Sequence, residues 1–272
     1  MGRHEEAIKA YDECLRVNGK YARAWYWKAQ SLHALKRFEE ALRCFERSLE
    51  IGSILDNTAW YFVGCCLVEL HRYEEAIKGF DGAIKLNRND AFSWKYKAEC
   101  LEKLGRHGEA ISSLEEALRT KTDDESLWCA KGKSYVRVQS FEEALRCFDK
   151  AIDLKRNYGL AWYWKGITLD KMNKFKEAIQ HFDESLKIDK NDKTAWLFKG
   201  KCYFDIGDYE LALKSFDEAL KFDANNDEYL NSRAKCLLKL KQFDAAIESF
   251  DRALNINENV TNTYPLLRNS FS

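Results

Sequence analysis

The stretch FEEALRCFDKAI, residues 141–152, recurs along this chain, and its nearest copy is FEEALRCFERSL at residues 38–49. The alanine at the fourth place of each copy marks the repeat: Ala7, Ala41, Ala76, Ala110, Ala144, Ala178, Ala212 and Ala246. These marker alanines lie 34 residues apart, except for one interval of 35 after Ala41. A fixed period of this length predicts an array of one supersecondary unit, which grows by stacking units rather than by enlarging one core.

Each repeat has the pattern of two amphipathic helices joined by a short polar break. In the repeat 159–192, Trp162, Gly166 and Leu169 follow at intervals of four and three, which places them on one face of a first helix. Residues 175–188 carry a second apolar stripe at helical spacing. Because one helix pair cannot bury both of its apolar faces alone, neighbouring pairs must stack. The sequence therefore predicts an all-α fold.

The period divides the chain into a single array of repeats. A half repeat occupies residues 1–21, complete repeats occupy 22–56, 57–90, 91–124, 125–158, 159–192, 193–226 and 227–260, and a partial terminal helix occupies 261–272. The half repeat lacks a first helix, and the last fragment lacks a second one. We therefore expect either a piece of a longer protein or ends that associate with another copy, head to tail.

Composition narrows the classes of function. Lys plus Arg and Asp plus Glu both number 44, so the net charge is zero, which argues against a dedicated nucleic-acid binder. The sequence has no apolar run long enough for a membrane span and no apolar signal-peptide core at its start. We expect a cytoplasmic protein with no membrane association.

Nine cysteines raise the question of disulfides or zinc. No Cys-x-x-Cys pair occurs, and Cys66, Cys100, Cys202 and Cys236 share one place in their repeats. Free cysteine packs well in protein interiors. We expect small buried thiols in a reducing compartment.

The residue types that recur at other places of the repeat identify a family. Sixteen residues before the marker alanine stand Trp25, Trp60, Trp94, Trp128, Trp162 and Trp196. Twelve before it stands Gly or Ala, and four after it stands an aromatic residue in every copy except at Leu114. This series on a 34-residue helix–turn–helix strongly resembles the tetratricopeptide repeat (TPR) family over essentially the whole chain. The resemblance implies a right-handed α-solenoid whose first helices line a concave groove, and we expect the six tryptophans in its core.

Two charged ladders share the period. A cation stands three residues after five of the six tryptophans, at Lys28, Lys97, Lys131, Lys165 and Lys199, and only Val63 interrupts this series; Arg233 holds the same place in the last repeat, after Leu230. An acidic residue stands five after every marker alanine. The two ladders either pair with each other or are two solvated faces, and the sequence leaves both interpretations open.

The resemblance places large aromatics and cations on or beside the groove. The aromatics are Tyr26, Trp27, Tyr61, Phe62, Phe92, Tyr96, Tyr163, Trp164, Phe198 and Phe204, and the cations between them are Lys95, Lys133, Arg137, Lys171 and Lys201. Such residues anchor protein ligands, although several of these rings could instead only pack against the adjoining repeat. We expect a scaffold that binds a peptide or helical segment of a partner protein, as yet unidentified.

Other functions are less well supported. Chaperone-binding members of the family hold a C-terminal carboxylate with a clamp of Lys, Asn and Arg, but here Tyr26, Gln30, Phe62, Phe92 and Tyr96 occupy the matching places, which disfavours chaperone tails. An RNA-binding helical repeat would need a more basic groove, and it remains an alternative together with self-assembly through the open ends. The five histidines are scattered and no glycine-rich phosphate loop occurs. We therefore expect no enzymatic activity, no metal site and no cofactor.

Overall fold

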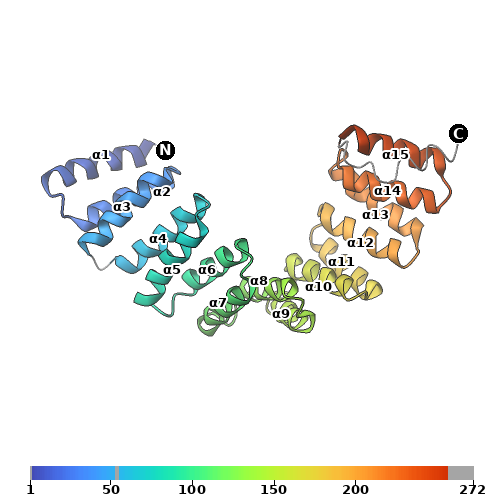
Figure 1. Cartoon of the computed structure of the whole chain (residues 1–272), viewed down its shortest axis with the longest axis horizontal. Coiled ribbons are helices and arrows are strands. Elements are labelled where there is room, and N and C mark those ends of the chain that lie inside the picture. The colour runs from blue at the N-terminus through green and yellow to red at the C-terminus, as the bar shows by residue number, and fades with distance from the viewer. Residues whose placement is uncertain (1, 53–54, 257–272) are drawn as a thin grey trace. The chain divides into compact units, whose positions relative to one another are not determined.

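A computed structural model describes residues 2–52 and 55–256, so the expected terminal helix at 261–272 lies outside the described residues. The described part contains fifteen α-helices and no strand (Figure 1). The first helices of the repeats are α2 (Ala22–Ala34), α4 (Asp56–Glu69), α6 (Ala91–Lys103), α8 (Glu125–Arg137), α10 (Gly159–Lys171), α12 (Lys193–Asp205) and α14 (Asp227–Lys239). The second helices are α1 (Gly2–Val17), α3 (Phe38–Ile51), α5 (Tyr73–Leu86), α7 (His107–Thr120), α9 (Phe141–Leu154), α11 (Phe175–Ile188), α13 (Tyr209–Phe222) and α15 (Phe243–Ile256).

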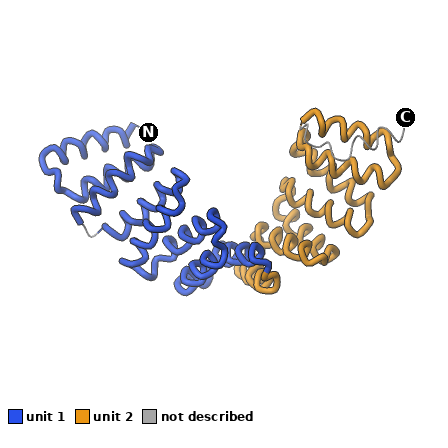
Figure 2. Tube along the Cα trace, in the orientation of Figure 1, with its two compact units in different colours: residues 1–139 blue, residues 140–272 orange. Residues whose placement is uncertain are grey.

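The helices form two compact units, residues 1–139 and 140–272 (Figure 2). Within the first unit, each helix from α1 to α8 packs against the next one along the chain. Within the second unit, α9 to α15 pack in the same successive way. Each unit is thus a stack of helix pairs, and the expectation of an all-α solenoid is confirmed.

The first and second helices of each pair are joined by the same tight turn. One residue in each turn has a positive φ between 58° and 86°: Lys36, His71, Gly105, Gln139, Asn173, Gly207 and Lys241. After Lys36, the backbone N–H of Arg37 donates to the Leu32 carbonyl at 2.9 Å, which is the bond of a Schellman motif. Glycine occupies this left-handed position only twice, so five turns hold a side chain in strained backbone.

Small residues allow the two helices of a pair to approach each other closely. The marker alanines from Ala41 to Ala246 have no exposed surface. The phenylalanine four residues later is also fully buried in most repeats, and it packs against the small residue of the first helix. A Cβ atom added at Gly166 would lie only 2.7 Å from the Phe182 ring. The recurring Gly/Ala, Ala and Phe therefore form one interlocking contact.

The six recurring tryptophans are only partly buried, and five of them pack against the core, so the expectation that they are core residues holds in part. In five of them the indole N–H donates to a backbone carbonyl six residues earlier, at 2.9–3.0 Å; these are Trp25, Trp94, Trp128, Trp162 and Trp196. Each of these bonds gives the polar hydrogen of a partly buried ring an acceptor and links the preceding loop to the first helix.

The two charged ladders pair with each other. Each pair joins a first helix to the second helix before it, at 2.5–3.0 Å: Lys28–Asp12, Lys97–Asp81, Lys131–Glu115, Lys165–Asp149, Lys199–Asp183 and Arg233–Asp217. The lysine side chains retain only 13–20 % of their exposure. In four repeats the ammonium also lies 4.8–5.6 Å from the centroid of the tryptophan ring on its own helix. Between α3 and α4 the buried Val63 takes the place of the lysine.

Candidate functional site

The first helices of unit 1 carry a row of aromatic rings in contact with one another. The ring of Trp27 lies 5.1 Å from that of Tyr26, and the ring of Tyr61 lies 5.2 Å from Phe62 and 5.7 Å from Tyr96. Phenylalanines of the second helices pack against these rings: Phe45 stacks on Phe62, and Phe80 stacks on Tyr96. The row therefore rests on the core and is held in place by it.

The aromatic residues on the first helices of unit 1 differ in how exposed they are to solvent. The side chains of Trp27 and Phe92 are 49 % and 55 % exposed, whereas Tyr26 is only 4 % exposed. Tyr26 packs edge-on against Phe45, its hydroxyl accepts a hydrogen bond from the Gln30 amide, and burial raises its pKa. Tyr26 is therefore a core residue and not a surface contact.

The remaining aromatics of unit 1 are intermediate. Tyr61, Phe62 and Tyr96 are partly buried. Burial raises the pKa of Tyr61. Because these rings are only partly exposed and pack on one another and on the core, they can contribute contact area to a partner.

Charged side chains also stand on the first helices α6 and α8 of unit 1. Lys95 and Lys133 are partly buried, and Arg137 is exposed at the end of α8. Burial raises the pKa of the Glu99 carboxyl on α6, although Lys95 and Lys133 oppose that rise. The ammonium of Lys121 lies 3.8 Å from the centroid of the Phe92 ring.

The first helices of unit 2 carry a similar set. Tyr163 contacts Trp164 and Phe198, with ring centroids 5.7 and 6.1 Å apart, and burial raises the pKa of Tyr163 to about 12. The ammonium of Lys201 lies 4.9 Å from the Phe198 centroid and pairs with Glu228 at 2.7 Å. Lys171 is exposed at the end of α10.

A small cavity of about 230 Å³ lies between α12 and α14. It is lined by Lys201, Phe204, Asp205, Phe216, Ser232 and Lys235. Burial and the nearby Asp170 raise the pKa of Asp205, and Lys201 opposes this rise. Lys201 and Phe204 were expected from the sequence, but Lys235 was missed. Its position 34 residues after Lys201 was the signal that could have found it.

Two kinds of feature are absent from the described part of the chain. Within residues 2–52 and 55–256, no group of three or more His, Cys, Asp or Glu side chains is placed so that it could hold a metal ion. Over the same ranges, no helix combines the length and apolar character needed to cross a membrane.

Comparisons with known proteins agree on one family. A family model described as tetratricopeptide repeat matches residues 1–53, 63–125 and 129–193, more than half of the chain, and two further models of that description match 171–236 and 228–260. An uncharacterized protein of Methanocaldococcus jannaschii is 38 % identical over 47 residues, which are 17 % of this chain and 55 % of that protein. The chain thus spans about half the length of that relative.

Solved structures share the fold at low sequence identity. The C-terminal part of a TPR repeat-containing protein from Cytophaga hutchinsonii superposes with a TM-score of 0.71 at 16 % identity, over 85 % of this chain and 94 % of that one. The TPR protein YrrB superposes with a TM-score of 0.56 at 22 % identity, over 70 % of this chain and 96 % of that one. At these identities the likeness shows the fold alone. Because the family model matches more than half of the chain, the chain belongs to the tetratricopeptide repeat family.

Proposed function

We propose that this protein is a scaffold that binds a segment of a partner protein along the first helices of unit 1. The observation that carries the proposal is the exposure of Trp27 on α2 and Phe92 on α6, since exposed aromatic side chains are the residue type that most often anchors a protein partner. The crystal structure of YrrB is reported under a title that names an unusual peptide-binding site, which supports the same class of function for a TPR fold.

The charges beside these rings favour an acidic segment. Lys121 lies over the Phe92 ring, and Lys95 stands on the same helix three residues further on. An Asp or Glu side chain next to an apolar anchor would meet these ammonium groups. The bound segment should therefore combine aromatic or aliphatic side chains with carboxylates.

We propose the same role for the first helices of unit 2, acting on a second stretch of the partner. Tyr163, Trp164, Phe198 and Phe204 would supply apolar contact there. Lys201 and Lys171 would supply charge, and Arg137 and Lys133 would do so in unit 1.

Selection from a random peptide library tests this proposal without knowledge of the partner. The native protein should enrich phage-displayed peptides that carry apolar and acidic residues together. A Trp27→Ala/Phe92→Ala variant should bind the selected peptides at least about tenfold more weakly, because each aromatic anchor contributes on the order of 1–2 kcal/mol. Leu86→Ala is the matched control, because Leu86 is equally exposed but lies on the second helix α5. An absence of enrichment, or unchanged binding by the folded double variant, would place the function elsewhere.

A further inference from the structure

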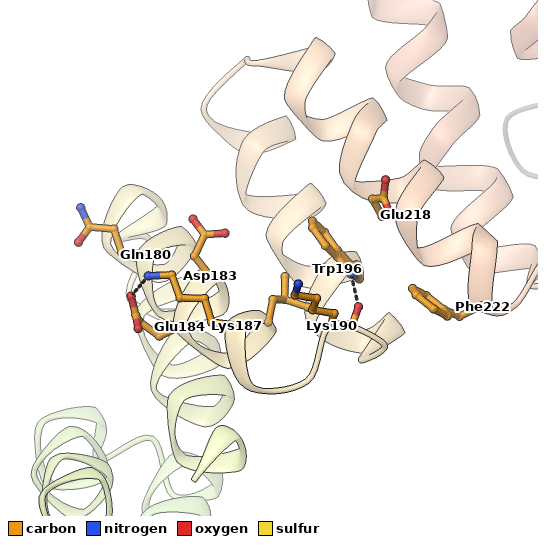
Figure 3. A pocket seen from close by; sticks show the side chains of 9 residues that line it. Gln180, Asp183, Glu184, Lys187, Lys190, Trp196, Glu218 and Phe222 are labelled. Carbon is orange, nitrogen blue, oxygen red and sulfur yellow. Dashed lines mark hydrogen bonds and ion pairs between the residues drawn. The ribbon is translucent and has the colours of Figure 1, made fainter. Parts of the chain in front are cut away.

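A second, larger cavity lies in unit 2 on the side of the second helices, between α11 and α13 (Figure 3). Its volume is about 610 Å³, and it is open to solvent. It is lined by Gln180, Asp183, Glu184, Leu186, Lys187, Lys190, Trp196, Glu218 and Phe222. We call it the outer pocket. None of its residues belongs to the aromatic and basic set of the groove, so the groove proposal leaves it unexplained.

One wall of the outer pocket is apolar, and its Trp196 ring is held in place. The indole N–H of Trp196 donates to the Lys190 carbonyl at 3.0 Å, and the Lys199 ammonium lies 4.8 Å from the ring centroid, so the ring is held in one orientation. Leu186 also lines the pocket and is buried, and Phe222 stands exposed at the end of α13. This wall offers apolar surface at little further loss of side-chain entropy on binding.

Two carboxylates beside that wall form only exposed ion pairs with lysines. Glu184 pairs with Lys187 and Glu218 pairs with Lys221, each at 2.5 Å within one turn of one helix. The side chains of these two lysines are 69 % and 63 % exposed. Exposed pairs of this kind contribute only ~0–1 kcal/mol, so a cation from outside can displace the lysine at small cost.

The next interface of the same unit shows which side chain this space accommodates. Between α13 and α15, one repeat further on, Arg252 occupies the place of Glu218 and Leu230 the place of Trp196. The Arg252 guanidinium donates to the Ala224 carbonyl at 3.2 Å, at a cavity of about 330 Å³ that both residues line. The chain thus places its own arginine in one inter-repeat space. In the larger space before it, the same place carries a carboxylate.

We propose that the outer pocket binds an arginine side chain of a partner protein. The aliphatic stem would lie against Trp196 and Phe222, and the guanidinium would donate to Glu218, which stands one turn before Phe222 on α13. Arginine fits better than lysine because its planar head stacks on rings and binds a carboxylate through two parallel hydrogen bonds. The site is independent of the first helices of unit 1, and because Lys187 and Lys190 also line it, it favours one arginine beside Glu218 rather than a generally basic surface.

Fluorescence anisotropy with two labelled peptides tests the proposal. One peptide is acetyl-ARALRALRA-amide, and the other replaces each arginine with glutamate. The native protein should bind the arginine peptide and leave the glutamate peptide unbound. Glu218→Arg should weaken binding at least tenfold, and the chain already carries arginine at the equivalent place of α15, so the helix accommodates it. Trp196→Leu, which copies Leu230, should also weaken binding.

Two controls separate this site from general charge attraction and from the groove. Glu210→Arg changes the same charge on an exposed part of α13 outside the pocket, and it should bind within twofold of the native protein. The Trp27→Ala/Phe92→Ala variant should bind the arginine peptide normally, even if the groove proposal fails. No binding of the arginine peptide, equal binding of the glutamate peptide, or an equal loss in Glu210→Arg would overturn the proposal.

Discussion

Replacing Gly79 by alanine should destabilise the protein, although alanine is the better helix former. Gly79 lies inside α5 where that helix meets α4, and an added Cβ would lie 2.8 Å from the Gly64 backbone nitrogen and 3.0 Å from its Cα. Both atoms belong to a helix backbone and cannot rotate away. Overpacking of this kind costs about 1–3 kcal/mol, whereas exchanging glycine for alanine in a helix gains about 0.5–1 kcal/mol. The cost of the overlap exceeds the gain in helix propensity, so we expect a net loss of about 1–2 kcal/mol in the free energy of unfolding.

Urea unfolding followed by circular dichroism measures this loss. Because repeat arrays need not unfold in one step, the variant is compared by its midpoint and by amide exchange in α4 and α5. Gly108→Ala in α7 is the matched control, because a Cβ added there would meet nothing within 4 Å, and it should be neutral or slightly stabilising. A Gly79→Ala variant as stable as the native protein would refute the close approach of α4 and α5.

Three further outcomes are expected. Lys165→Met and Asp149→Ala, combined in a double-mutant cycle, should show a coupling of about 0.5–1 kcal/mol in the free energy of unfolding. No coupling would mean that this ion pair does not stabilise the protein. Lys241→Gly should raise stability by about 0.5–1 kcal/mol, because it relieves a φ of 59°; a loss would show that this turn is not strained. Burial raises the pKa of Cys66 to about 12, so the folded protein should lose stability as the pH rises above about 9, where only unfolded thiols ionise. Rapid alkylation of Cys66 in the folded state at pH 8 would contradict this.

The helix pattern could be predicted from the sequence because it depends on local repetition. A residue type that returns every 34 positions meets the same neighbours each time, so the burial of Ala144 predicts the burial of Ala178. The same logic extends to the fully buried Phe148 and Phe182. Periodicity therefore identifies which residues share an environment.

Periodicity does not predict how exposed each side chain is to solvent. Tyr26 and Trp27 are adjacent aromatics on one helix, and a rotation of about 100° places one in the core and the other half in solvent. The tryptophans recur like core residues, yet they are only partly buried, and their indole N–H groups donate to backbone carbonyls of the preceding loop. Pairing of the two charged ladders likewise depends on how a first helix lies against the second helix before it, which residue spacing alone leaves undetermined.

Side-chain footprinting with hydroxyl radicals shows whether a partner segment binds along the first helices of unit 1. A peptide selected on the native protein is added, and the oxidation of each exposed side chain is measured by mass spectrometry. We expect strong protection of Trp27 and Phe92 on the first helices and no protection of Leu86 or Val17, which are exposed on second helices. Protection of Leu86 or Val17 with Trp27 and Phe92 still oxidised would contradict this expectation.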